Sequence, residues 1–170
     1  MHLQPTLANE LVQIVPLQAS DFEDVFNIAS DKLLWEQHPE KERYKIEVFQ
    51  AFFKTAIASK SAFKLVDVIT GNTIGTSRYY DFNEIEKSVA IGFTFIDRKY
   101  WATSYNRNIK NLMINYAFQY IENIIFHVGD TNFRSQKAVE KLGAVITETV
   151  FVEATNSTHL VFTLEKKNWH

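Results

Sequence analysis

Residues 91–120, IGFTFIDRKYWATSYNRNIKNLMINYAFQY, decide the fold of this chain. The run from Ile91 to Ile96 is β-branched or aromatic apart from Gly92, which predicts a strand with a bulge or a close backbone approach at the glycine. A short polar turn follows, and Ser104 stands at the N-cap position of a helix whose apolar residues recur at helical spacing. A loop that leads from a strand to the start of a helix offers free amides and the helix dipole, so we expect an anion site here.

Composition limits the classes of protein that this sequence can represent. Its 170 residues suit one domain with a substantial core, and a net charge of −2 with scattered Lys and Arg argues against a nucleic-acid surface. There is no cysteine, which excludes disulfides and thiolate chemistry, and the five His lack metal-ligand spacing, so no metal site is expected. Neither a signal peptide nor an apolar run long enough to cross a bilayer is visible, so we expect a cytoplasmic protein without a membrane partner.

The periodicity of apolar residues predicts the order strand, two helices, three strands, helix, strand, helix, two strands. The predicted strands are 11–17, 62–70, 73–82, 87–96, 121–128, 144–153 and 157–165, with the last two joined by a turn at 154–156. The predicted helices cover 22–29, 44–59, the segment after 104, and 132–142. Hairpins combined with one or two crossovers imply a mixed α/β sheet with helices on both faces. In the strand at 87–96, large residues alternate with small ones, so one face fills the core and the other leaves room for a ligand or a helix.

Two motifs resemble the GNAT superfamily of acyl-CoA N-acyltransferases. The frame Lys99–Ser104 (KYWATS) occupies the place of the Arg/Gln-x-x-Gly-x-Gly/Ala loop that binds acetyl-CoA, and Asn132–Ala144 (NFRSQKAVEKLGA) is very similar to the Asn-x-x-Ser…Glu-Lys-Leu-Gly-Phe block. The Ile-Gly-Phe at 91–93 adds to the resemblance, whose nearest branch is the RimJ/RimL-like ribosomal-protein N-terminal acetyltransferases. The resemblance covers residues 1–170 as a single domain. It implies a mixed, mostly antiparallel seven-stranded sheet in which two parallel central strands splay apart.

The resemblance also implies acetyl-CoA as co-substrate, without a metal. In the family the pantetheine arm lies between the splayed strands, so the backbones of Phe93, Thr94 and Phe95 are expected to contact it. The amides of Trp101, Ala102, Thr103, Ser104, Tyr105 and Asn106 are expected to hold the diphosphate, with Arg98, Lys99 or Arg107 neutralising its charge. Asn132 and Ser135 are expected on the pantetheine side, with Ser135 near the sulfur.

The loop departs from the family pattern because Ala102 and Ser104 replace its two glycines. Both residues can still offer an amide if φ is negative there, whereas a positive φ would strain them. The Ser104 hydroxyl then either caps the helix or bonds a phosphate oxygen.

Direct acyl transfer to an amine needs a base, an oxyanion donor and a proton for the leaving thiolate. By resemblance, the Phe93 or Thr94 amide donates to the oxyanion and Ser135 serves the thiolate, with Tyr105 as a second candidate. Many relatives carry Glu where Ala90 stands, so the base is not identified. The remaining candidates are a water chain and the carboxylates of Glu36, Asp81, Glu84, Glu148 and Glu153.

Several of these side chains also have purely structural interpretations. Ser135 could face solvent, Asn132 could act only as an N-cap, and Trp101 could fasten the loop to the core. Trp35 is expected either in the core or as a lid over a pocket. His127 lies within an apolar strand and is expected to be a core histidine rather than a base.

The function predicted first is an acetyl-CoA-dependent N-acetyltransferase that acts on a primary amine, such as a peptide N-terminus or a small amine. The alternative is a GNAT domain that binds or senses acyl-CoA with little turnover, favoured by Ala90 and the glycine-free loop. A domain used only for protein interaction has no positive signal in the sequence. We expect a monomer or a homodimer.

Overall fold

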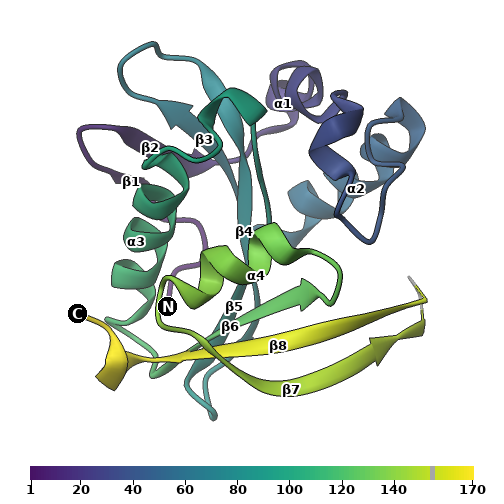
Figure 1. Cartoon of the computed structure of the whole chain (residues 1–170). Coiled ribbons are helices and arrows are strands. Elements are labelled where there is room, and N and C mark those ends of the chain that lie inside the picture. The colour runs from purple at the N-terminus through teal and green to yellow at the C-terminus, as the bar shows by residue number, and fades with distance from the viewer. Residues whose placement is uncertain (154–155) are drawn as a thin grey trace.

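The computed structural model describes residues 1–153 and 156–170 and contains one eight-stranded sheet, in the order β1-β2-β3-β4-β5-β6-β8-β7 (Figure 1). The strands are β1 (Leu7–Ala8), β2 (Val12–Pro16), β3 (Ala62–Asp67), β4 (Thr73–Asn83), β5 (Ser88–Ile96), β6 (Asn123–Gly129), β7 (Val145–Val152) and β8 (Ser157–Glu165). Two residues of the turn predicted at 154–156, Ala154 and Thr155, lie outside the described residues. Neighbouring strands are antiparallel except for the parallel pair β5–β6.

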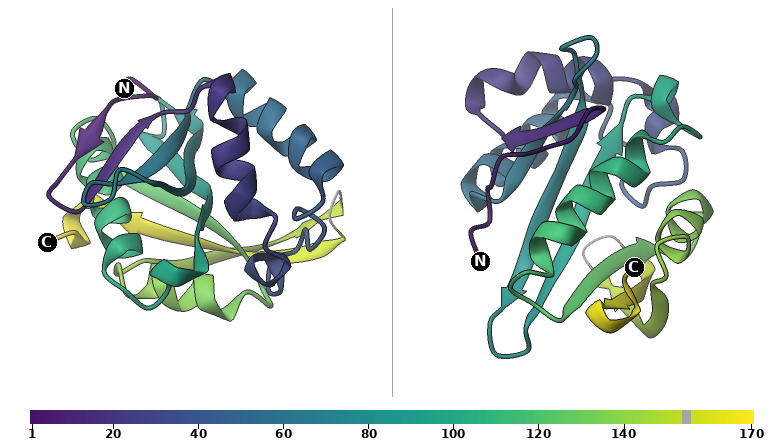
Figure 2. Two further views of the ribbon diagram at one scale, coloured as in Figure 1. Left: turned by 90° about the horizontal axis from the view of Figure 1, so that it is seen from above. Right: turned by 90° about the vertical axis from the view of Figure 1, so that its left-hand side faces the viewer.

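Four α-helices cover the two faces of the sheet within the described residues. The helices are α1 (Phe22–Ala29), α2 (Ile46–Ser59), α3 (Tyr105–Ala117) and α4 (Phe133–Glu140). Helices α1 and α2 lie on one face, and α3 and α4 lie on the other (Figure 2, left). The predicted mixed α/β architecture is therefore confirmed.

The prediction of seven strands was wrong by one. The additional strand β1 consists of Leu7 and Ala8 only and pairs with the edge of β2. Two residues are too few to show a period of two, so this strand leaves no hydrophobic pattern in the sequence.

Two apolar clusters hold the sheet between its helices. On the α3 side, Ile109, Met113 and Ile114 are fully buried against the sheet. On the α1–α2 side, the Phe22 ring packs edge-on against Phe53, with centroids 5.2 Å apart, within a group of aromatic rings that extends to Phe95 on β5. This packing on both faces fixes the position of β5, the strand that carries the predicted site.

The two parallel strands separate partway along their length. Pairing between β5 and β6 covers Ser88–Ala90 and Asn123–Ile125, after which β5 runs on to Ile96 and β6 to Gly129 without further pairing to each other. Over the same residues β5 stays paired to β4 and β6 stays paired to β8. The sheet therefore remains continuous on either side of a gap, as the predicted splay requires.

A bulge redirects β5 where the gap begins. The β4–β5 register shifts between Thr76 and Arg78, and Phe93 adopts a left-handed φ of 51°. A Cβ placed on Gly92 would lie 2.8 Å from Cε1 of Tyr80, so glycine is needed there for a close side-chain approach. The bulge interrupts the expected alternation: Phe93, predicted among the large core-facing residues, is 37% exposed, whereas its neighbours Ile91 and Phe95 are buried.

Candidate active site

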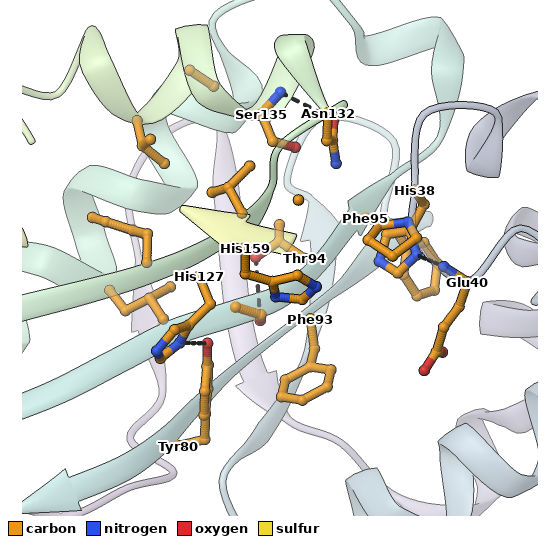
Figure 3. Close-up of a pocket in the computed structure, with 18 of the residues that line it drawn as sticks. His38, Glu40, Tyr80, Phe93, Thr94, Phe95, His127, Asn132, Ser135 and His159 are labelled. Carbon is orange, nitrogen blue, oxygen red and sulfur yellow. Dashed lines mark hydrogen bonds between the residues drawn. The ribbon is translucent and has the colours of Figure 1, made fainter. Parts of the chain in front are cut away.

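Two adjoining cavities occupy the gap between β5 and β6. The larger, about 850 Å³, lies beside the loop before α3 and the residues of α4, and we call it the anion cavity. The smaller, about 490 Å³, contains His38, Tyr80, His127 and His159, and we call it the histidine cavity (Figure 3). The side chains that line both cavities define their junction; they include His38, Thr94, Lys110, Asn132 and Ser135.

The anion cavity is strongly electropositive. Its basic side chains belong to α3, to α4 and to the residue that follows α4: Arg107, Lys110, Arg134, Lys137 and Lys141. The Arg134 guanidinium lies 3.8 Å from the centroid of the Trp101 ring, which holds it over the loop. No Asp or Glu is among the described residues that line this cavity. Such a lining suits a ligand with several negative charges.

The start of α3 provides backbone donors for the same ligand. Its first intrahelical bond runs from the Asn108 amide to the Ser104 carbonyl, at 3.0 Å, so the amides of Asn106 and Arg107 precede the helical ladder. The Tyr105 amide donates to Thr103 Oγ1 at 3.4 Å. Trp101 to Ser104 line the cavity instead of filling it. The Trp101 indole donates to the Ile96 carbonyl at 3.2 Å, which ties the loop to the end of β5.

The two missing glycines have different consequences. Ser104 has a φ of −74° and is unstrained, and its hydroxyl makes no capping bond, so it stays available to a ligand. Ala102 adopts a φ of 59°, the left-handed conformation that a glycine would take at roughly 1–2 kcal/mol lower cost.

Most residues predicted to bind the co-substrate line the cavities. These are Phe93, Thr94, Phe95, Trp101, Ala102, Thr103, Ser104, Asn106, Arg107, Asn132 and Ser135. Arg98 and Lys99 do not: Arg98 pairs with Asp31 at 2.5 Å, and Lys99 pairs with Asp97 at 3.4 Å.

Tyr105 and Glu153, predicted as catalytic, also lie outside both linings. The Tyr105 hydroxyl donates to Asp67 at 2.9 Å, beside Tyr100, and burial with this carboxylate raises the pKa of Tyr105 to about 12. Glu153 is exposed next to the end of β7. The other predicted carboxylates, Glu36, Asp81, Glu84 and Glu148, are exposed and line neither cavity.

Asn132 and Ser135 meet at the start of α4. The Asn132 side-chain oxygen accepts from the Ser135 amide at 3.3 Å, so Asn132 is the N-cap, and it also lines both cavities. Ser135 is half-buried, and its hydroxyl has no hydrogen bond to the described part of the chain. Figure 3 shows Asn132 and Ser135 on the opposite side of the cavity from Tyr80 and His127.

Trp35, expected either in the core or as a lid, is a core residue that also lines the cavities. It is 2% exposed, its indole donates to the Ala29 carbonyl at 2.7 Å, and its ring also lines both cavities.

His127 was predicted to be a core residue, and this was wrong. Its side chain is exposed in the histidine cavity, where Nδ1 lies 2.7 Å from the Tyr80 hydroxyl. Ile124, Phe126 and Val128 of β6 are buried, so the alternation of the strand already placed His127 on the opposite face.

Glu40 is the one carboxylate among the described residues that line the histidine cavity, and it forms an ion pair with Arg43 at 2.5 Å. His38 contacts both residues: its Nδ1 accepts from the Glu40 amide at 2.9 Å, and its Nε2 lies 3.5 Å from Nη1 of Arg43. Burial, followed by the charge of Arg43, lowers the pKa of His38 to about 3, so this imidazole is neutral at pH 7.

Lys110 is the functional candidate that the sequence interpretation missed. The side chain is 6% exposed, and its Nζ donates to the Thr94 hydroxyl at 2.6 Å. Burial lowers its pKa to about 7. The sequence did indicate that Lys110 is buried. Lys110 precedes the buried Ile114 and Ala117 by four and seven residues, which places it on the buried face of the helix.

The fold and site together define an α/β domain in which two parallel strands splay apart beside a cavity lined by basic side chains. A sequence model described as an acetyltransferase (GNAT) domain matches residues 12–145. The chain therefore belongs to the GNAT acetyltransferase family, and the prediction of an N-acetyltransferase enzyme is confirmed at the level of the family. A comparison with curated proteins found no match.

Solved structures support the same fold. A GCN5-related N-acetyltransferase from Brucella melitensis has a TM-score of 0.85 at 16% identity, covering 98% of this chain and 80% of that one. Spermidine N-acetyltransferase from Vibrio cholerae, in complex with CoA and spermine, has a TM-score of 0.73 at 17% identity (94% and 98% covered). Ribosomal-protein-S5-alanine acetyltransferase from Vibrio fischeri has a TM-score of 0.71 at 18% identity (98% and 100% covered). At these identities the similarity concerns the fold alone.

Proposed function

We propose that this protein transfers an acetyl group directly from acetyl-CoA to a primary amine. The observation that carries the proposal is the separation of β5 from β6 after Ala90 and Ile125. The cavity beside it is lined by four cationic side chains and the buried Lys110, and by no Asp or Glu among the described residues. The diphosphate and 3′-phosphate of CoA match that charge, and the open edges of two strands match the amides of its pantetheine arm.

The residues that would hold acetyl-CoA follow from this fit. The amides at the start of α3 would bind the diphosphate, with Arg107 and the α4-side cations Arg134, Lys137 and Lys141 neutralising its charge. The backbone of Phe93–Phe95 would contact the pantetheine arm. Bound acetyl-CoA supplies an acyl thioester, an activated carbonyl that an amine can attack without a covalent enzyme intermediate.

At or beside the junction, the Phe93 or Thr94 amide is the proposed oxyanion donor and Ser135 the proposed hydrogen-bond donor to the leaving sulfur. Ser135 suits this role because its hydroxyl is otherwise uncommitted among the described residues. We leave Tyr105 and Glu153 out of the proposed machinery because neither lines a cavity.

The acceptor amine would enter through the histidine cavity. A protein or peptide α-amine, as in the RimJ/RimL-like branch, and a small amine both fit the proposal. The solved structures include one enzyme named for each kind of acceptor. We further propose that residues 1–170 form a single GNAT domain, that it acts in the cytoplasm as a monomer or homodimer, and that it needs neither nucleic acid nor a membrane. No helix in the described residues is long and apolar enough to cross a membrane.

A second candidate function is an acyl-CoA-binding or sensing domain with little turnover. It is favoured by Ala90, which stands where many relatives carry a glutamate, and by the ion pair that occupies Glu40, the one carboxylate among the described residues that line the cavities.

Release of free thiol from acetyl-CoA separates the two functions. We expect release in the presence of at least one member of a panel of peptide α-amines and polyamines, with acetylated acceptor found by mass spectrometry. Binding of acetyl-CoA without thiol release for any amine would favour the sensing domain, and absence of binding would contradict both functions.

A further inference from the structure

Lys110 and His38 are the two titratable side chains that line both cavities, among the described residues. The proposed function, on which this inference rests, places the diphosphate in the anion cavity and the acceptor in the histidine cavity. The thioester carbon then lies at the junction, because the acyl group passes from a donor held in one cavity to a nucleophile held in the other. Lys110 and His38 are therefore the groups placed to handle protons at the reacting atoms.

Lys110 is held at this junction without a counter-ion. Its Nζ donates to Thr94 Oγ1 at 2.6 Å, and that hydroxyl lies 2.7 Å from the hydroxyl of Ser77. The ring of Phe126 covers it, with a centroid 5.9 Å from Nζ. No carboxylate within the described residues pairs with Lys110. A buried ammonium in such surroundings loses its proton more readily than an exposed lysine does.

His38 is not available as a base. Its Nδ1 lone pair already accepts the Glu40 amide at 2.9 Å, which places the proton of the neutral ring on Nε2. Protonation of Nδ1 would break the hydrogen bond from the Glu40 amide. It would also place a positive charge beside the Arg43 guanidinium, whose Nη1 lies 3.5 Å from Nε2.

We infer that Lys110 is a catalytic residue that carries the proton from the acceptor nitrogen to the leaving sulfur. The acceptor enters as the neutral amine. As its nitrogen bonds to the thioester carbon, that nitrogen loses a proton to the neutral Lys110 amine. The carbon–sulfur bond breaks, Lys110 returns the same proton to the sulfur while Ser135 hydrogen-bonds it, and the products are an amide and a free thiol.

The surroundings of Lys110 allow its side chain to be either an ammonium ion or a neutral amine. Its neighbours from β4 and β5 are hydroxyls. Charged or titratable groups of the same cavities lie on α3 and α4, in the segments before α2 and α3, and on β4, β6 and β8: Arg107, Arg134, Lys137, Lys141, His38, Glu40, Arg43, Tyr80, Tyr100, His127 and His159. Burial alone accounts for the lowered pKa of about 7, and a group with such a pKa accepts and returns a proton near neutral pH.

The test compares thiol release by the wild-type protein with that of Lys110→Arg and Lys110→Met, with the neutral acceptor amine saturating at each pH. Arginine keeps the charge but does not deprotonate, and methionine keeps the length without a titratable group. We expect kcat at pH 7.5 to fall about 100-fold or more in both variants, whereas Lys54→Met, an exposed lysine of α2, has no effect. We also expect the rise of wild-type kcat near pH 7 to be absent in Lys110→Met.

Thermal stabilisation by acetyl-CoA shows in parallel that each variant is folded and binds the co-substrate. If Lys110→Arg binds acetyl-CoA and keeps kcat within about threefold of wild type, the proton-transfer role is wrong while the proposed function stands. If the wild-type protein itself releases no thiol with any amine, the transferase function fails and the inference fails with it.

Discussion

Ala90 and Ile125 form the last pair that joins β5 to β6, and both strands continue beyond this pair on separate paths. Beyond this pair β5 and β6 do not pair with each other, so a ligand can add to the edge of a strand there. This relationship explains how one sheet holds both a rigid core and a deep cleft.

Hydrogen exchange should detect the filling of this gap. We expect acetyl-CoA to protect the amides of residues 92–96 and to leave those of 88–90 unchanged, because the latter are already paired with β6. Mass-spectrometric exchange on peptides that cover β5 makes the comparison, with β8 as an internal control that pairs with β6 throughout. Equal protection along the whole of β5 would argue against binding within the gap.

The cations of the anion cavity should control affinity for acetyl-CoA. We expect Lys137→Ala combined with Lys141→Ala to weaken binding about tenfold at low salt, and less at high salt, because both lysines line the cavity. The matched control is Arg98→Ala, which removes a cation that pairs with Asp31 outside the cavity. Calorimetry at two ionic strengths measures the difference, and a larger loss in the Arg98 variant would contradict the assignment.

Lys110 should make stability depend on pH in a defined direction. Its pKa is lowered to about 7 in the folded protein, so between pH 7 and its unfolded pKa of about 10.4 the unfolded chain binds more protons. The penalty for burying the ammonium is present in full below pH 7 and is relieved as pH rises through that window. Lys110→Met should therefore be a few kcal/mol more stable than wild type at pH 6, and the advantage should shrink by pH 9.

Denaturant unfolding at both pH values measures this difference. A stability difference between the two proteins that is the same at pH 6 and pH 9 would mean that the Lys110 ammonium is well solvated in the folded state.

The left-handed conformation of Ala102 predicts a stabilising substitution. With φ at 59°, Ala102→Gly should relieve strain and raise the free energy of unfolding by up to about 1 kcal/mol. Ser104→Gly is the matched control at the other missing glycine: with φ at −74° it relieves nothing and should be neutral or destabilising. Denaturant unfolding measures both variants. A higher free energy of unfolding for Ser104→Gly than for Ala102→Gly would contradict this loop conformation.

The long periodic elements were predictable from the sequence, whereas local departures from periodicity were not. Strand β8 was predicted at 157–165 and found at Ser157–Glu165, because it is a run rich in β-branched and aromatic residues that follows a polar turn. The left-handed Phe93 was not foreseen: a bulge depends on the register with β4, although Gly92 marked its neighbourhood.

Predicted site residues line a cavity where backbone position decides their place, and lie outside the cavities where side-chain partners decide it. Trp101 to Ser104 line the cavity because a loop between β5 and α3 has to lie there. Arg98 and Tyr105 have the right chemistry and nearly the right position, but Asp31 and Asp67 engage them elsewhere. Those acidic partners are 67 and 38 residues away along the chain, so no local pattern revealed them.

Acetyl-CoA binding followed by thermal unfolding tests the central claim most directly, namely that the gap between β5 and β6 holds a CoA thioester. At a concentration 100 times the dissociation constant, we predict stabilisation by about 2.7 kcal/mol, seen as a rise in Tm. No change in Tm at millimolar acetyl-CoA would contradict the claim.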